Sequence, residues 1–287
     1  MTVPSGSRSG LDRAGRAAVR RILEHPKFEV LPLKNVLDQV RWLPEGATVS
    51  ITASPTKTLE DTMDVAAELR LRGFQVVPHL SARMTHDKTH LAALLGRMDE
   101  LEISRIFLVG GDAPQRGIFP DAYSLLLAMD DLGHHLTEVG VTSYPEGHAV
   151  IPDAKLWQAL HDKQPYASYL TTQMCFDPEA IGDFISGCRA DGIALPVRIG
   201  IPGVADRLKL IQISTRIGVG QSVRFLSKHR GLVTKFIKPG GYAPEGLLEG
   251  LAPLADDPAA AILGVHIYTF NQCETTERWR QEYLATL

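Results

Sequence analysis

The stretch that decides the fold is 104–117, SRIFLVGGDAPQRG, in which a short apolar run ends abruptly at two glycines and an aspartate. Residues 106–109 predict a strand that is buried on both faces, because a bounded run of four apolar residues is typical of a parallel sheet. The glycines allow a sharp turn and leave Asp112 at the carboxyl end of the strand. Ligands of parallel α/β folds bind at this edge, so Asp112 is either a turn residue or a ligand-binding group, and its place after Gly-Gly favours the turn.

The same order of apolar strand, polar turn and helical segment repeats along most of the chain. The eight expected strands cover 28–32, 47–53, 74–81, 105–111, 138–145, 167–176, 195–202 and 261–270. The helices expected between them cover 59–72, 91–102, 121–132, 152–163 and 178–191, and 205–255 is expected to hold several short helices with a loop at 238–241. Eight strands that alternate with helices indicate a (β/α)8 barrel, and no GxGxxG follows an early strand as an open dinucleotide-binding sheet would require.

A single barrel domain across residues 1–287 is expected, because this length is typical of one such barrel. The first ten residues are rich in Ser and Gly and are predicted to be mobile. Residues 11–24 carry alanines and Ile22 at helical spacing among arginines, which predicts an extra amphipathic helix before the barrel.

The charge and cysteine content restrict the possible partners and compartment. The formal net charge of −3 provides no basic field for nucleic acid, so nucleic-acid binding is excluded. The three cysteines show no CxxC spacing, which suits a reducing compartment. No run approaches the ~20 apolar residues of a membrane helix, and the N-terminus lacks the apolar run of a signal peptide, so a cytoplasmic protein without a membrane partner is expected. The oligomeric state is not determined.

Polar side chains lie in or just after most of the predicted strands. In a barrel, such groups from different strands converge on one site at the carboxyl ends. The residues are Glu29, Thr52, His79, Asp112, Tyr144, Glu146, His148, Gln173, Tyr268 and Asn271.

Each of these residues also has a structural interpretation. An acid inside the first strand is costly to bury, so Glu29 favours function over a structural ion pair. His79 is at least as well explained as a core histidine, and Gln173 either binds the edge of a heterocycle or bonds a neighbouring strand. For Tyr268 and Asn271 the two interpretations are evenly balanced.

Metal binding and cysteine chemistry are not favoured. His79, His86 and His90 lack the HExxH arrangement, so no metal site is predicted. Cys175 and Cys273 show no histidine partner in the sequence, so neither is predicted to be a nucleophile. Tyr144 either lies in the site or packs with its hydroxyl satisfied.

Taken as an ordered set, these motifs resemble the methylenetetrahydrofolate reductase family, whose members are (β/α)8 barrels. The resemblance runs from about residue 28 to the end of the chain. The matching motifs are Phe28-Glu29-Val30-Leu31-Pro32, Pro78-His79-Leu80, Gly111-Asp112-Ala113-Pro114, Tyr144-Pro145-Glu146-Gly147-His148, Thr172-Gln173-Met174-Cys175-Phe176-Asp177 and 264–271, GVHIYTFN.

The resemblance implies a role for each matched residue. Glu29 matches the acid that protonates folate N10 and opens the five-membered ring to an N5-iminium, and Asp112 matches the carboxylate that holds the pterin. Hydride then adds to the exocyclic methylene and gives 5-methyltetrahydrofolate. An acid of this kind must be neutral near neutral pH, so the pKa of Glu29 is expected to be raised by burial. The resemblance further implies substrate binding by Gln173, Tyr268 and Asn271, and cofactor binding by Thr52, His79, Tyr144 and His148.

The chain departs from the family where its FAD-dependent members hold the flavin. Those members have an aromatic residue at the position of Ala53, an arginine at the position of Gly110, and an Asp, Asn and basic cluster on the helix after the fifth strand. That helix here carries Trp157, Leu160, Asp162 and Lys163, and the last motif continues as Asn271-Gln272 in place of Asn-Arg. The pyrophosphate of FAD would therefore lack the basic side chains that stabilise its negative charges in those members. The pattern resembles the flavin-free mycobacterial reductases, which implies direct hydride transfer from NADH or NADPH without FAD.

Three other functions stay open. One is the ordinary FAD-dependent reductase, and another is a folate-binding paralogue without turnover, against which the acid Glu29 argues. The third is a barrel lyase or aldolase, which would need a lysine at the carboxyl end of a strand to form a Schiff base. None of the predicted strands ends in a lysine.

Overall fold

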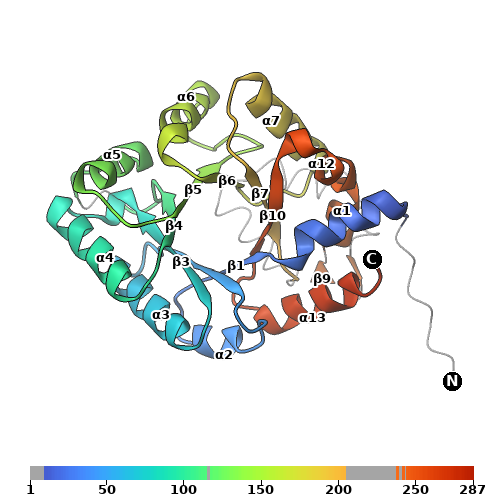
Figure 1. The fold of residues 1–287 in the computed structure, drawn as a ribbon, viewed down its shortest axis with the longest axis horizontal. Helices are drawn as coiled ribbons and strands as arrows, with labels where there is room; N and C mark the ends of the chain where they lie inside the picture. The colour runs from blue at the N-terminus through green and yellow to red at the C-terminus, as the bar shows by residue number, and fades with distance from the viewer. Residues whose placement is uncertain (1–9, 115–116, 205–236, 239–240, 243) are drawn as a thin grey trace.

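The computed structural model describes residues 10–114, 117–204, 237–238, 241–242 and 244–287. Eight parallel strands close into a barrel in the order β1-β10-β7-β6-β5-β4-β3-β2, which confirms the predicted (β/α)8 fold (Figure 1). The strands are β1 (Lys27–Val30), β2 (Thr48–Ile51), β3 (Gln75–Ser81), β4 (Arg105–Val109), β5 (Glu138–Ser143), β6 (Tyr169–Thr172), β7 (Val197–Pro202) and β10 (Ile262–Tyr268).

Helices surround the barrel, and most of them lie where the sequence predicts them. They are α1 (Arg13–Glu24), α2 (Val36–Val40), α3 (Leu59–Leu71), α4 (Lys88–Glu100), α5 (Ala122–Leu132), α6 (Asp153–Lys163), α7 (Pro178–Ala190), α11 (Glu245–Gly250), α12 (Ala252–Asp256) and α13 (Cys273–Leu284). Of these, α2 and α13 were not predicted. Short 3-10 turns at Ala82–Met84, Gln164–Tyr166 and Pro258–Ala260 complete the connections.

Side-chain caps fix the beginnings of several helices. Thr58 and Asp61 form a reciprocal capping box at the start of α3, and Asp121 and Ser124 form another at the start of α5. Each box satisfies backbone N–H groups that have no partner within the helix. These caps determine where the loops after β2 and β4 end.

The predicted N-terminal helix is confirmed as α1, which packs against α12 and β10 at the side of the barrel (Figure 1). Its buried face consists of Ala18, Val19, Ile22 and Leu23. Of the segment predicted to be mobile, residues 1–9 lie outside the described residues. That the whole chain forms one domain stays a prediction.

The last third of the chain differs in part from the prediction. Short helices α11 and α12 occur as expected, and the rest of the segment, 205–236, lies outside the described residues. Within the predicted loop at 238–241, Lys238 and Gly241 instead pair between two short antiparallel strands, β8 (Ile237–Lys238) and β9 (Gly241–Tyr242).

The barrel interior is closed near its amino end by a buried ion pair. The Lys27 ammonium pairs with Glu138 and donates to the Tyr169 hydroxyl at 2.8 Å, while it lies 4.0 Å from the centre of the Tyr169 ring. Burial lowers the pKa of Lys27 to about 8, and Arg198 adds to this effect. Above this pair lies a small apolar layer of Val77, Phe107 and Tyr169. A ligand therefore has access from the opposite, carboxyl end.

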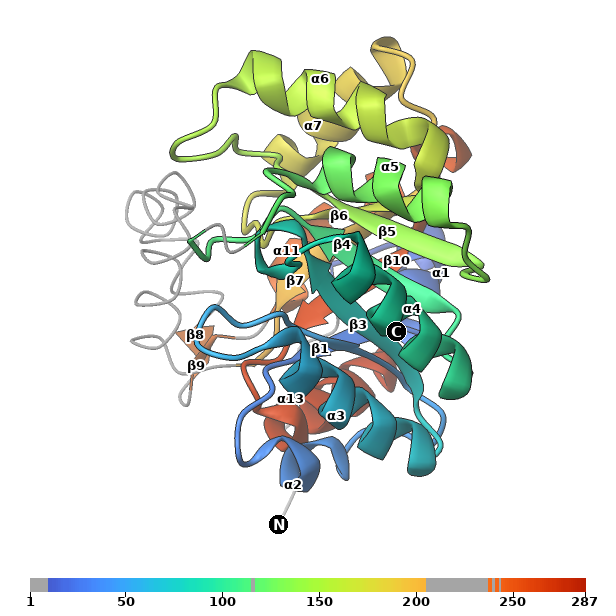
Figure 2. The ribbon, with the colours of Figure 1, turned by 90° about the vertical axis from the view of Figure 1, so that its left-hand side faces the viewer.

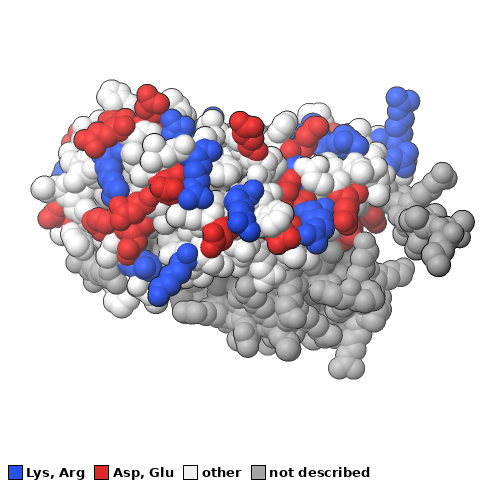
Figure 3. Space-filling view, turned by 90° about the horizontal axis from the view of Figure 1, so that it is seen from below, with Lys and Arg blue, Asp and Glu red and all other residues white. Residues whose placement is uncertain are grey.

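The loops that follow the strands gather on that carboxyl side, together with β8 and β9 (Figure 2). On the face in Figure 3, acidic and basic side chains are interspersed over the described surface. Charged side chains on the surface of the protein pair with each other in several places, as Arg72 does with Glu68 at 2.8 Å. Within the described part of the chain, no helix is both long and apolar enough to cross a membrane.

Candidate active site

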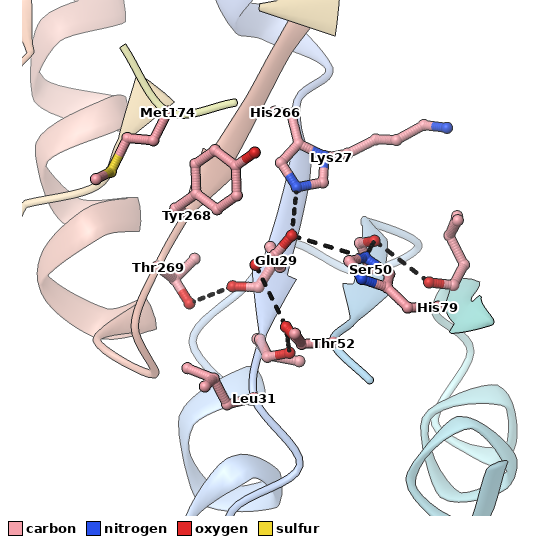
Figure 4. Close-up of polar contacts among 12 residues, drawn as sticks. Lys27, Glu29, Leu31, Ser50, Thr52, His79, Met174, His266, Tyr268 and Thr269 are labelled. Atoms are coloured by element: carbon pink, nitrogen blue, oxygen red, sulfur yellow. Dashed lines mark hydrogen bonds and ion pairs between the residues drawn. The ribbon is translucent and has the colours of Figure 1, made fainter. Parts of the chain in front are cut away.

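Glu29 lies inside the barrel and is held by side chains from three other strands or strand ends (Figure 4). Its carboxylate accepts a hydrogen bond from His266 Nε2 at 2.9 Å and lies 3.6 Å from His79 Nε2. Thr52 Oγ1 donates to the other carboxylate oxygen at 3.3 Å. The register explains the convergence, since Glu29 is aligned with Tyr268 on β10 and with Ser50 on β2. The Glu29 side chain is 15% exposed, so it remains accessible to a ligand.

The expectation that the pKa of Glu29 is raised is wrong for this arrangement. Burial acts in that direction, but the hydrogen bond from His266 and the interactions with His79 and Thr52 outweigh it and lower the pKa below its ordinary value. An acid role for Glu29 therefore needs a change in its surroundings when substrate binds.

His79 is buried beside the carboxylate of Glu29. It is 4% exposed, bonds the Ser50 hydroxyl at 2.8 Å and packs its ring 4.9 Å from that of Phe107. Burial lowers its pKa to about 4, against the opposing charge of Glu29, so its imidazole is neutral near pH 7. His79 thus lies where it can position Glu29, and the cofactor contact expected of it from the sequence stays a prediction.

His266 is the functional residue that the sequence reasoning missed. It is 1% exposed and lies two residues before Tyr268 on β10, so both side chains point to the same, inner face of the barrel. This alternation was the available signal, once Tyr268 was assigned to the site. Thr52, expected to bind a cofactor, also donates to the Val30 carbonyl at 3.0 Å and thus links β1 to β2.

Tyr268 lies near Glu29, and Gln173 directly follows the carboxyl end of β6. The Tyr268 hydroxyl donates to the Thr172 carbonyl at 3.1 Å, and burial, with the charges of Glu29 and Tyr144, raises its pKa well above the ordinary value. Gln173 uses its side-chain oxygen to accept the N–H of Met174 at 3.2 Å. Among the described residues the Gln173 amide nitrogen has no hydrogen-bond acceptor, which leaves its N–H groups for a ligand.

Asp112 is exposed at the carboxyl end of β4, where the sequence places it. The turn before it depends on Gly111, which has a φ of +92° and whose added Cβ would overlap the Ser81 hydroxyl. Asp112 is close enough to Tyr144 that its charge, after burial, raises the pKa of that tyrosine. Asp112 therefore lies near Tyr144, which follows the neighbouring strand β5.

Asn271 is occupied by structural contacts. Its side-chain oxygen accepts the N–H of Leu31 at 2.8 Å, and its nitrogen donates to the Leu31 carbonyl at 3.0 Å and to Asn35 at 3.2 Å. Asn271 is 5% exposed and joins the ends of β10 and β1, and the substrate binding expected of it from the sequence stays a prediction.

His148 shapes the loop after β5. Its Nδ1 accepts the N–H groups of Val150 and Ile151 at 3.3 Å each, and its ring stands edge-on to Tyr144 at 5.1 Å. The expected cofactor contact of His148 stays a prediction, and its observed partners are the loop backbone and Tyr144.

A cavity of about 660 Å³ opens beside this site, between the ends of β4 and β5 and helices α5, α6 and α7. Most of the positions at which this chain differs from the FAD-dependent members of the family lie in the lining of this cavity. Those that line it are Gly110, Trp157, Leu160, Asp162 and Lys163. Among the described residues, no group of three or more His, Cys, Asp or Glu is arranged to hold a metal ion.

The closed parallel barrel, with an acid held by two histidines and open toward the carboxyl ends of its strands, defines a (β/α)8 barrel with a candidate acid-base site. The profile of one family, methylenetetrahydrofolate reductase, matches residues 24–280. The chain therefore belongs to the methylenetetrahydrofolate reductase family.

Individual relatives are distant. A Caenorhabditis elegans protein described as a probable methylenetetrahydrofolate reductase (NADPH) is 22% identical over 273 residues, which are 86% of this chain and 39% of that protein. The chain thus spans well under half the length of this relative.

Similar solved structures support the fold alone. One is the apo form of a putative deoxyribose-phosphate aldolase from Toxoplasma gondii ME49, with a TM-score of 0.50, 8% identity, and coverage of 95% of this chain and 98% of that one. Another is AbfB, a family 51 alpha-L-arabinofuranosidase from Bifidobacterium longum, with a TM-score of 0.53, 11% identity, and coverage of 92% and 73%.

Proposed function

We propose that this protein reduces 5,10-methylenetetrahydrofolate to 5-methyltetrahydrofolate with hydride delivered directly by NADH or NADPH. The observation that carries the proposal is the accessible carboxyl of Glu29, held by His266 and His79 at the carboxyl side of the barrel. Family membership supplies the reaction class. Small-molecule substrates, a cytoplasmic location and a single barrel domain belong to the same proposal.

The reaction needs one proton and one hydride. Protonated Glu29 gives its proton to folate N10, the C–N10 bond breaks, and an N5-iminium forms. Hydride from the reduced nicotinamide then adds to the exocyclic methylene carbon, which leaves oxidised nicotinamide and 5-methyltetrahydrofolate. One proton and one hydride are thus consumed for each product formed.

Because its pKa is lowered, Glu29 must become protonated as folate binds if it is to act as the acid. When folate covers the carboxyl, the remaining water leaves and burial then favours its neutral form. Glu29 takes this proton from solvent, and the His266 N–H that donates to Oε2 keeps the carboxyl oriented. His266 is therefore a positioning residue for Glu29.

The remaining residues bind the pterin in this proposal. The amide nitrogen of Gln173 donates to the heterocycle edge, and the Asp112 carboxylate accepts from its N–H groups and stabilises developing positive charge. Tyr268 packs beside Glu29 and limits water at the reacting centre.

A resident FAD does not fit the residues at the cavity. Its pyrophosphate carries two negative charges and needs several donors. The cavity lining contains four acids, Asp121, Glu146, Asp153 and Asp162, and two lysines, Lys155 and Lys163, while Gly110 contributes no side chain. This charge balance supports hydride transfer without flavin.

A spectrum and a kinetic assay test the proposal. We expect the purified protein to be colourless, to oxidise NADH or NADPH only when methylenetetrahydrofolate is present, and to follow sequential kinetics because both substrates must be bound together. A yellow protein with ping-pong kinetics would establish the FAD-dependent reaction. Folate binding without nicotinamide oxidation would instead identify a non-catalytic paralogue.

A further inference from the structure

Ser50 is a buried polar residue that the proposed reaction does not use, and it contacts the histidine beside Glu29. It lies in β2, is fully buried and is aligned with Glu29 of β1. Its hydroxyl lies 2.8 Å from His79 Nε2 and donates to the Val77 carbonyl at 3.3 Å. These contacts join Ser50, His79 and Glu29 in one chain of polar groups (Figure 4).

The Glu29 carboxylate determines which nitrogen of His79 carries the proton. His79 is neutral near pH 7, because burial lowers its pKa to about 4, so only one of its ring nitrogens is protonated. Its Nε2 lies 3.6 Å from Glu29 Oε2, and the lowered pKa of Glu29 keeps that carboxylate ionised. A lone pair at Nε2 would be repelled by the negative charge, whereas an N–H is attracted to it. The proton of neutral His79 therefore lies on Nε2.

This N–H has two neighbouring acceptors, and the distances decide between them. Ser50 Oγ, at 2.8 Å, is within hydrogen-bond range of Nε2, and Glu29 Oε2, at 3.6 Å, is outside it. The serine hydroxyl has a single hydrogen, which it donates to the Val77 carbonyl, so its oxygen accepts the N–H of His79. Ser50 thus occupies a donor that would otherwise be directed at the carboxylate.

The other polar and titratable groups beside the carboxylate are already bound. His266 and Thr52 donate to it, one to each oxygen. The Tyr268 hydroxyl donates to a backbone carbonyl, and the Lys27 ammonium pairs with an acid near the amino end of the barrel. Among these described neighbours, His79 is the one whose N–H lies near the carboxylate and is bound to a different acceptor.

A hydrogen bond from His79 to Glu29 would oppose the proposed acid role. A donor on the carboxylate stabilises its ionised form, as the bond from His266 already does. Glu29 must instead take up a proton as folate binds. A second N–H on Oε2 would make this uptake less favourable, and the bond between His79 and Ser50 prevents it.

We propose that Ser50 is a positioning residue that holds the Nε2–H of His79 away from Glu29 and so keeps the carboxyl able to take up the proton that folate N10 receives. The inference rests on the proposed function and deepens it. It gives the two histidines opposite parts, since the N–H of His266 is directed at the carboxylate and that of His79 is directed away from it.

The pH profile of Ser50→Ala tests this role. Without the hydroxyl, the buried N–H of His79 loses its acceptor and turns to Glu29 Oε2, the other acceptor beside it. We expect the alkaline limb of the kcat/KM profile to move about one pH unit lower, so that kcat/KM above the limb falls about tenfold. Ser50→Thr keeps the hydroxyl and should keep the wild-type limb. A limb in Ser50→Ala that is unmoved, or that moves to higher pH, overturns the inference.

Ser143→Ala is the matched control. Ser143 in β5 is also fully buried and also donates to a carbonyl of the neighbouring strand, that of Thr171 at 3.2 Å, but in the described part of the chain it bonds no histidine. Its loss should leave the alkaline limb where it is in wild type. In a His79→Phe background, which has no imidazole N–H, Ser50→Ala should no longer move the limb. A shift that persists there overturns the inference, because Ser50 would then act without His79.

Nuclear magnetic resonance tests the same arrangement without turnover. Proton–nitrogen correlation spectra of histidine-labelled wild type should show the His79 proton on Nε2, with the signal identified by its loss in His79→Phe. The Glu29 carboxyl, identified by its loss in Glu29→Gln, should titrate about one pH unit lower in Ser50→Ala than in wild type. A His79 proton on Nδ1, or equal carboxyl titrations, overturns the inference. The wild-type spectrum decides the question even if Ser50→Ala does not fold, which circular dichroism and a thermal melt establish.

The two proposals fail in different ways. Folate-dependent nicotinamide oxidation with an unmoved limb in Ser50→Ala overturns the role of Ser50 and leaves the reductase function intact. The expected spectra and carboxyl titrations without any folate-dependent oxidation overturn the reductase function, while the placement of the His79 proton by Ser50 is retained.

Discussion

His266 Nε2 lies 2.9 Å from Glu29 Oε2, and the other nitrogen of the same ring, Nδ1, is buried without a hydrogen-bond partner. A buried N–H without an acceptor is costly, so we assign a proton to Nε2, from which it donates to the carboxylate. One histidine therefore both orients Glu29 and lowers its pKa. The first two predictions separate these effects.

Glu29→Gln should abolish folate-dependent turnover and leave folate binding measurable. The amide keeps the shape and much of the hydrogen bonding of the acid but has no proton to give to N10, so we expect a loss of about 10²- to 10⁴-fold in kcat. Stopped-flow nicotinamide oxidation and a separate folate titration measure the two quantities. Glu60→Gln is the control, since Glu60 also bonds a histidine, His90, but is exposed on α3. Substantial activity in Glu29→Gln would remove Glu29 from the acid role.

His266→Phe should move the alkaline limb of the kcat/KM profile to higher pH. The ring lies among Phe107, Tyr268 and the carboxyl of Glu29, so a phenyl group fills the same space without the hydrogen bond. Loss of that bond raises the pKa of Glu29, and the acid then stays protonated to a higher pH. The maximal rate should fall, because the carboxyl is no longer oriented. A lower rate with an unmoved limb would indicate a purely structural role for His266.

The barrel could be predicted from the sequence because its strands are short apolar runs between polar turns. It overestimated the length of β6, since Met174, Cys175 and Phe176 continue the apolar run of Tyr169–Thr172 but are buried in the loop that follows. A buried loop and a buried strand have the same composition, and only the ladder of hydrogen bonds distinguishes them.

A site residue could be predicted from the sequence where its type is unusual for its position in a strand. It could not be predicted where its role depends on a contact with a residue far away in the sequence. Glu29 is anomalous within its own strand and was identified. The role of His266 depends on the register that aligns β10 with β1, and that of Asn271 depends on the backbone of Leu31, 240 positions away. Neither relationship is encoded in local periodicity.

The stability of the fold should decrease from pH 6.5 toward pH 4 because of His79. Its pKa is about 4 in the folded protein and 6.5 ordinarily, so in this window the unfolded state binds a proton that the folded state does not. The lowered pKa of His79 contributes at most about 3 kcal/mol to the free energy of unfolding. This contribution is fully present above pH 6.5 and is lost as the pH falls toward 4. The lowered pKa of Glu29 acts separately, with stability lost below its ordinary value of 4.5.

Urea unfolding of wild type and His79→Asn at pH 7 and pH 5 measures this contribution. The variant should be less stable at pH 7, since it loses the Ser50 bond, but its stability should change less between the two pH values. His135→Gln, at an exposed position before β5, should keep the wild-type pH dependence. Equal slopes in wild type and His79→Asn would contradict a neutral, buried His79.

The adjacent glycines at the end of β4 should respond differently to alanine. Gly111 has a φ of +92°, and a Cβ there would overlap the Ser81 hydroxyl, so Gly111→Ala should cost about 1–3 kcal/mol of unfolding free energy. An added Cβ at Gly110 meets no atom within 4 Å, so Gly110→Ala should change the stability by about 0.5 kcal/mol or less. Urea midpoints of the two variants provide the comparison, and equal losses would mean that the turn is not strained.

The open space at Gly110 allows a direct test of why flavin is absent from the proposed reaction. Gly110 lines the acidic cavity, and an added Cβ there meets no atom within 4 Å, so Gly110→Arg should fold with near wild-type stability. Its guanidinium would supply the bidentate donor that a pyrophosphate needs, and FAD affinity should rise by tenfold or more. Equilibrium dialysis with FAD measures the change, with Gly110→Ala as the matched control. If wild type already binds FAD as tightly as Gly110→Arg, the missing arginine is not what excludes the flavin.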